Sequence, residues 1–195
     1  MRFMIKILAV VCLFLATPAF AGGHITWNSV DAESRIAFGS IKKDEFGEVH
    51  HFNKVSGTVK ENGDMVITID LGSVETNIDI RNERMKRHVF QGGKATAIVT
   101  GTIDMDEVNS MKVGETRVVE IEALLKFAGA ENEIDAEMLI ARLSENRVLV
   151  TTADFIMIST EDLGITEGVD MLMKLAKLPS ITRATPVSVR MVFEK

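Results

Sequence analysis

The sequence predicts an all-β fold, an extended antiparallel β-barrel of eight strands with one or two inserted helices. Most of the chain alternates apolar and polar residues with the two-residue period of half-buried strands. Turn signals such as Asn62-Gly63 and Glu145-Asn146 separate the alternating runs. Closing such a sheet removes its edges, and an eight-stranded barrel is filled by side chains or holds one small ligand.

The strongest alternation lies in the segments that we expect to form the longest strands. In residues 115–127, Ile121 and Leu125 share one face with Phe127, while Glu120 and Glu122 lie on the other. Residues 24–30 are expected to form a short opening strand. The eight long strands are expected at residues 34–42, 52–60, 65–71, 94–104, 115–127, 133–140, 147–158 and 185–193.

Two segments lack this alternation and are expected to form the inserted helices. Residues 77–90 are rich in helix-forming residues. Residues 167–178 place Val169 and Leu172 at helical spacing, and Pro179 is expected to end the helix.

The N-terminus has the pattern of a secretory signal peptide. Arg2 and Lys6 precede an apolar run over residues 7–15, and the segment ends in small residues at Ala21. The apolar stretch is shorter than the roughly 20 residues that span a bilayer, although an uncut anchor is the alternative. We therefore expect residues 1–21 to be a cleaved signal and residues 22–195 to form one domain.

This cleavage would leave a soluble, acidic protein without cysteine. The only cysteine, Cys12, lies inside the predicted signal, so the mature chain would form no disulfide. Loss of Arg2 and Lys6 would change the net charge from −6 to −8. That charge disfavours nucleic acid and anionic membranes as general partners. The predicted location is the periplasm.

Several segments, taken in order, carry a resemblance to a known family. Residues 24–28 (HITWN) and 34–38 (SRIAF) open the chain, and residues 55–59 (VSGTV) follow. Residues 73–90 combine a Ser-x-x-Thr strand end, an Arg-Asn pair and an aromatic residue after a helix, and residues 163–166 read LGIT. This combination resembles the YceI-like family of polyisoprenoid-binding, lipocalin-like periplasmic proteins.

The chain departs from the family pattern at two places. Residues 91–95 read QGGKA, where the family usually has a Tyr-Pro segment, and Asn82 follows Arg81 where many members have Asp. Both departures concern one entrance to the barrel. They therefore bear on the identity of the ligand more than on the fold.

The resemblance implies a lipocalin-like barrel that holds a long isoprenoid chain in its lumen. Alternation alone leaves open whether the apolar inner face fills a core or lines a cavity, and the resemblance favours the cavity. A prenyl quinone or a polyprenyl phosphate would then be the ligand of a periplasmic carrier, with no other cofactor. The inner-face positions expected to line the lumen are Ile36, Phe38, Ile67, Ile69, Ile121, Leu125, Phe127, Met138, Ile156 and Val189.

Three cationic or titratable residues are candidates for binding a polar head group. Arg81, Arg84 and His88 lie at helical spacing on one face of the segment 77–90. A guanidinium group matches the geometry of a phosphate. The alternatives are a solvated charged face and, for Arg81, a structural bond to a carbonyl or carboxylate.

Other polar residues give weak signals for chemistry. His50 and His51 point to opposite faces of a strand, so no metal site is predicted. An acidic segment that begins at Asp104 is expected to be a solvated turn. The chain lacks the common nucleophile, phosphate-loop and dinucleotide motifs, so no catalytic residue is predicted.

Two other functions remain as alternatives to a carrier. One is an interaction protein with a filled barrel, which would dock a membrane redox or envelope protein. The other is an enzyme acting on a lipid or quinone, with His88 or Asp79 as the acid–base group. The sequence leaves a homodimer open.

Overall fold

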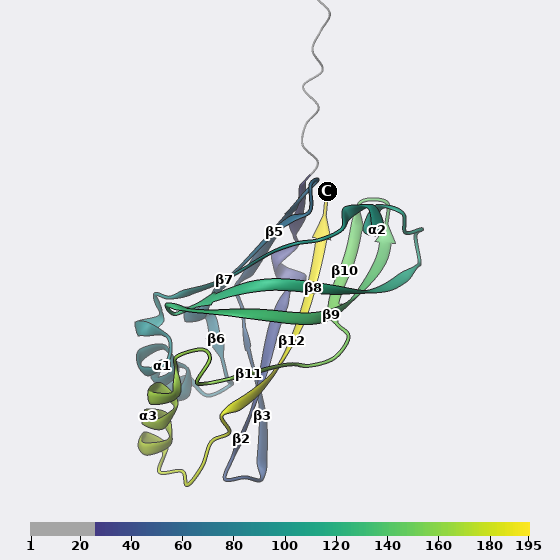
Figure 1. The fold of residues 1–195 in the computed structure, drawn as a ribbon. Helices are drawn as coiled ribbons and strands as arrows, with labels where there is room; N and C mark the ends of the chain where they lie inside the picture. The colour runs from purple at the N-terminus through teal and green to yellow at the C-terminus, as the bar shows by residue number, and fades with distance from the viewer. Residues whose placement is uncertain (1–25) are drawn as a thin grey trace, which may run out of the picture.

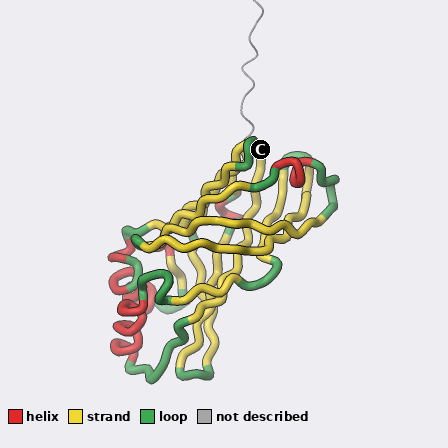
Figure 2. Tube along the Cα trace, viewed as in Figure 1, coloured by secondary structure: helices red, strands yellow, loops and turns green. Residues whose placement is uncertain are grey.

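The structure, a computed structural model, describes residues 26–195; the predicted signal segment lies outside the described residues. The described part contains a twelve-stranded antiparallel sheet and three α-helices (Figures 1 and 2). The helices are α1 (Asp79–His88), α2 (Met105–Asn109) and α3 (Thr166–Ala176). The strands are β1 (Thr26–Ser29), β2 (Arg35–Lys42), β3 (Phe46–Phe52), β4 (Val55–Lys60), β5 (Asp64–Asp70), β6 (Val74–Glu75), β7 (Thr96–Thr102), β8 (Thr116–Phe127), β9 (Ala130–Ser144), β10 (Arg147–Thr152), β11 (Ile156–Ser159) and β12 (Ala184–Glu194).

Eight strands close into a barrel in the order β1, β4, β5, β7, β8, β9, β10 and β12. The last strand closes it because β12 pairs with β10 on one edge and with β1 on the other, where Ser29 lies opposite Phe193. This topology confirms the predicted eight-stranded antiparallel barrel. Closure leaves these paired edges unavailable to other chains.

The sheet also extends beyond the barrel along the first half of β12. There Val187 lies opposite Phe38 of β2 on one edge and opposite Ile156 of β11 on the other. β3 and β6 continue the sheet outward from β2. In Figure 1 the β2–β3 hairpin reaches one end of the molecule, and the C-terminus and α2 lie at the opposite end.

Alternation along the strands separates the interior from the surface. In β5, Met65, Ile67 and Ile69 are buried, whereas Val66 between them is 39% exposed. The same period places Val119, Ile121, Leu125 and Phe127 of β8 inside. The barrel interior is therefore built from the aliphatic positions that the sequence pattern indicates.

Three features differ from the sequence prediction. The predicted strand over residues 147–158 is divided, because a bend at residues 153–155 separates β10 from β11. The expected turn after Asp104 is the short helix α2, and the Asp104 side chain caps it by accepting hydrogen bonds from the backbone N–H groups of Asp106 and Glu107. β3 is an additional strand that apolar alternation does not predict, because its inward positions include the polar residues Glu48 and His50.

The helices α1 and α3 confirm the two predicted insertions, and they pack against each other at the end from which β2 and β3 extend (Figure 2). Their close approach depends on Gly168, where a Cβ atom would lie 2.4 Å from the carbonyl oxygen of His88. α3 ends at Ala176 because Lys177 adopts a left-handed conformation, before the chain reaches Pro179. In residues 26–195, no helix combines the length and the apolar character needed to cross a membrane.

Candidate ligand-binding cavity

The interior of the protein contains two adjoining chambers. The outer chamber, of about 370 Å³, lies beneath α1 and α3, and the inner chamber, of about 170 Å³, lies within the closed barrel. Because five residues line both chambers, the two chambers adjoin, and we call them together the apolar passage. The shared residues are Ile36, Ile69, Leu125, Ile158 and Val187.

The inner chamber has only apolar residues on its wall. Trp27 lies on this wall with Met105 and Val108, the two buried residues of α2. The cationic groups of Arg142 and Lys195 lie 5.2 Å and 4.8 Å from the centre of the Trp27 ring. These contacts cover the aromatic face by cation–π attraction at the end of the barrel remote from α1 and α3.

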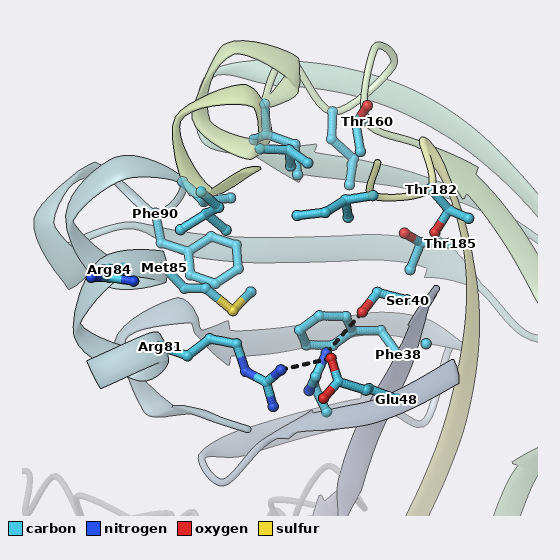
Figure 3. Close-up of a pocket in the computed structure, with 18 of the residues that line it drawn as sticks. Phe38, Ser40, Glu48, Arg81, Arg84, Met85, Phe90, Thr160, Thr182 and Thr185 are labelled. Atoms are coloured by element: carbon cyan, nitrogen blue, oxygen red, sulfur yellow. Dashed lines mark hydrogen bonds and ion pairs between the residues drawn. The ribbon is translucent and has the colours of Figure 1, made fainter. Parts of the chain in front are cut away.

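The outer chamber is bounded by α1, α3, the β2–β3 hairpin and the mouth of the barrel. Figure 3 shows Met85 and Phe90 reaching into this space from α1 and the segment after it, with Phe38 facing them. Leu172 of α3 lines the same chamber. The two helices therefore extend the apolar passage beyond the barrel instead of filling it.

Phenylalanine rings form a continuous row along the outer chamber. Phe38 stacks on Phe52 with 5.2 Å between ring centres, and Phe52 meets the edge of Phe90 at 5.7 Å. Phe90 in turn lies 6.1 Å from Phe127. Such offset and edge-to-face pairs are favourable, so this row joins the hairpin, α1 and the barrel into one wall.

A cluster of ionic groups occupies the hairpin side of the chamber (Figure 3). The Arg81 guanidinium donates to a carboxylate oxygen of Glu48 at 2.7 Å and to the carbonyl oxygen of Thr76 at 2.7 Å. Lys42 donates to the other carboxylate oxygen of Glu48 at 2.9 Å. Burial raises the pKa of Glu48, but the hydrogen bonds and attraction from Arg81 and Lys42 outweigh it, so this pKa lies below its ordinary value.

His50 is buried beside this cluster and is only 3% exposed. Its Nε2 atom lies 3.0 Å from the Ser40 hydroxyl, while its Nδ1 atom has no hydrogen-bond partner among the described residues. Burial lowers the pKa of His50 from 6.5 to about 4, and the charge of Arg81 acts in the same direction. The imidazole is therefore neutral at pH 7, and the chamber wall avoids a second buried cation.

A buried polar contact fixes the start of α1 and hence the position of Arg81. The Asn82 side-chain oxygen accepts hydrogen bonds from the backbone N–H of Thr76 at 2.8 Å and from its hydroxyl at 2.6 Å. The Asn82 amide donates to Glu75 at 3.0 Å. An Asp at position 82 would lack this donor, so the departure from the family pattern suits the carboxylate of Glu75.

The structure places all ten predicted lumen residues on a chamber wall. Phe38 and Phe127 line the outer chamber, and the others line the inner chamber or both. Of the head-group candidates, Arg81 and Arg84 line the outer chamber. His88 is on neither wall, because the last turn of α1 packs against α3. Contact between these residues and a ligand remains a prediction.

Sequence reasoning missed the polar residues of β2 and β3. Ser40, Lys42, Glu48 and His50 line the chamber, but strand alternation identifies only apolar inward positions. The available signal was the spacing of Phe46, Glu48, His50 and Phe52 at every second residue, which places them on one face of β3. Their contact with α1 depends on the fold and has no local signal.

Together, the closed antiparallel sheet and the apolar passage define a lipocalin-like β-barrel. A model of the YceI-like domain matches residues 27–193. The chain therefore belongs to the YceI-like family, which confirms the resemblance seen in the sequence.

Two solved structures are similar to the chain. A polyisoprenoid-binding domain from Saccharophagus degradans, implicated in plant cell wall breakdown, is 32% identical with a TM-score of 0.83, over 86% of this chain and 97% of that one. BcnA from Burkholderia cenocepacia is 12% identical with a TM-score of 0.64, over 84% of this chain and 98% of that one, and shows the fold alone. No match was found among curated proteins.

Proposed function

We propose that the protein binds a long-chain isoprenoid lipid, either a prenyl quinone or a polyprenyl phosphate. The observation that carries the proposal is the apolar passage through the outer and inner chambers, with ionic groups only near its outer end. The prenyl chain would occupy the passage. The similar domain from Saccharophagus degradans, which binds polyisoprenoid, supports the same ligand class.

The apolar wall accounts for how such a ligand would be held. Burial of each methylene group stabilises a complex by on the order of 0.8 kcal/mol, so a long chain needs few polar contacts. The inner chamber has no polar residue on its wall to satisfy a charged or hydroxylated ligand. The head group would therefore remain in the outer chamber.

Arg84 is the cation best placed to meet a charged head group. Both terminal nitrogens of Arg81 already donate to Glu48 and to the carbonyl of Thr76. Arg84 also lines the outer chamber, and its guanidinium forms no ion pair or hydrogen bond within residues 26–195. Figure 3 shows Arg84 at the edge of the chamber, apart from the Arg81–Glu48 pair.

The proposed role is that of a periplasmic carrier or reservoir. It combines the proposed lipid site with the signal peptide predicted for residues 1–21, and it requires no chemical step. The chamber inside the barrel supports a carrier over the filled-barrel alternative. The enzyme alternative has no support from its two candidates, since neither Asp79 nor His88 lines a chamber.

Paired substitutions on β5 test the proposed site. Ile69 lines both chambers, whereas Val66 points outward from the same strand. We expect Ile69→Asp to abolish retention of lipid through purification, because a carboxylate would face the prenyl chain without a partner. Val66→Asp should retain lipid at the wild-type level. Mass spectrometry of extracted lipid measures both.

A second variant covers the case in which Ile69→Asp does not fold. Val187→Trp keeps the wall apolar but places a large ring at the junction of the chambers. We expect it to fold with a stability loss of about 1–3 kcal/mol and to lose the ligand. Wild-type lipid retention in a folded Val187→Trp variant would contradict the proposed passage.

A further inference from the structure

Apolar side chains are exposed around the opening of the outer chamber. Ile78 and Ile80, at the start of α1, line the chamber and are also exposed, Ile80 to 59%. Other exposed apolar residues lie beside lining residues on the hairpin and on α3. We call this set the mouth rim: Phe46, Ile78, Ile80 and Leu175.

The mouth rim comes from three separate elements that the fold holds together. The tip of the β2–β3 hairpin is tied to the segment after α3, because the backbone N–H of Lys43 donates to the carbonyl oxygen of Ser180 at 3.1 Å. The Ser180 hydroxyl donates to Asp44 at 2.7 Å. Because three elements present apolar groups at one opening, the rim is a shared surface rather than a scatter of single residues.

Charge at this end differs from charge on the side of the barrel. On the outer face of the β8–β9 pair, Glu120 lies opposite Glu137 and Glu122 lies opposite Asp135. Around the mouth, cations offset the acids Asp44, Glu45 and Asp79. These cations are Lys43, Arg84, Lys174 and Lys177, whereas Lys42 is paired with Glu48.

From this combination we propose that the mouth rim docks on the surface of an anionic lipid bilayer. The apolar rim would enter the interface between head groups and acyl chains, and the neighbouring lysines would meet anionic head groups. The acidic face of β8–β9 would be repelled, so the protein would approach with its mouth toward the membrane. A prenyl chain could then pass between the bilayer and the outer chamber without crossing water.

This inference rests on the proposed function, since a prenyl ligand is what makes contact with a bilayer useful. The two are nevertheless separable by experiment. Docking is measured by co-flotation of the protein with vesicles of phosphatidylcholine and phosphatidylglycerol. Ligand binding is measured by uptake of a prenyl lipid, either ubiquinone or a polyprenyl phosphate, from detergent micelles, where no bilayer is present.

The test compares two double variants that change exposed apolar residues only. Phe46→Ser with Leu175→Ser removes rim residues that line neither chamber, and Val66→Ser with Val118→Ser removes outward residues of the barrel that are 39% and 52% exposed. We expect the rim variant to bind anionic vesicles at least tenfold more weakly than wild type, and the barrel variant to bind within twofold of wild type. Both should take up quinone from micelles like wild type.

Other outcomes overturn the inference. Equal vesicle binding by the rim variant and wild type, or an equal loss in the barrel variant, would show that the rim is not the docking surface. A wild-type protein that takes up quinone from micelles but never floats with anionic vesicles would refute docking while leaving the proposed function intact. Failure to take up either ubiquinone or a polyprenyl phosphate from micelles would instead refute the proposed function.

Discussion

At the scale of single residues, the outer chamber carries its polar groups in a compensated form. Glu48 neutralises Arg81 and also binds Lys42, while His50 is kept neutral by burial. Removing one partner would leave a poorly solvated charge, which is costly. The polar wall therefore stabilises the junction of α1 with the hairpin at neutral pH and weakens it in acid.

The pH dependence of stability follows from His50. Its folded-state pKa of about 4 lies below its ordinary 6.5, so between these values the unfolded chain binds the additional proton. The free energy of unfolding should fall by on the order of 3 kcal/mol from this residue as the pH drops through that window. Glu48 also lowers the free energy of unfolding at lower pH. Its pKa is lowered in the folded state, so its carboxylate stabilises the fold while ionised and loses that contribution when it is protonated.

The comparison of wild type with His50→Gln isolates this contribution. Urea unfolding at intervals between pH 7 and pH 4 should show a flatter loss of stability in the variant, whatever its stability at pH 7. Parallel curves for the two proteins would mean that the protonation of His50 is not linked to folding.

Asn82 is expected to contribute to stability through its buried contacts with Thr76. In Asn82→Ala the backbone N–H and hydroxyl of Thr76 lose their acceptor, which should lower the free energy of unfolding by about 2–3 kcal/mol. Glu83→Ala, on the exposed side of the same helix, removes a surface ion pair with Lys86 and should change it by less than about 0.5 kcal/mol. Urea unfolding at pH 7 distinguishes the two; equal losses would contradict this account.

At the scale of elements, predictability depends on which residues point inward. β5 and β8 follow from the sequence because every second residue is aliphatic and buried. β3 does not, because Glu48 and His50 are made tolerable inside only by partners distant in sequence. The same dependence separates the lumen residues, which alternation identifies, from the ionic cluster, which requires α1 to fold onto the hairpin.

The packing of α3 against α1 gives a prediction for Gly168. In Gly168→Ala the added Cβ would lie 2.4 Å from the backbone oxygen of His88, so α3 must shift. We expect a net loss of about 1–2 kcal/mol in unfolding free energy, although Ala is the better helix former. Gly47→Ala, which adds a Cβ into open space, should be neutral by comparison. Thermal unfolding measures both, and an unchanged or higher Tm for Gly168→Ala would contradict this packing argument.

At the scale of the whole molecule, the protein has two unlike ends. The end near α2 is covered around Trp27, and the end near α1 and α3 opens between helices and hairpin. A chain-like ligand would enter at one end and lie along the passage. This polarity connects the proposed lipid site with the proposed membrane surface, and it places both at the same opening.

The most direct test of the central claim is native mass spectrometry of the protein purified from its own cell envelope, followed by solvent extraction. The account predicts a discrete added mass that extraction identifies as a prenyl quinone or a polyprenyl phosphate. A protein that carries no added mass and takes up no prenyl lipid when offered it would contradict the account.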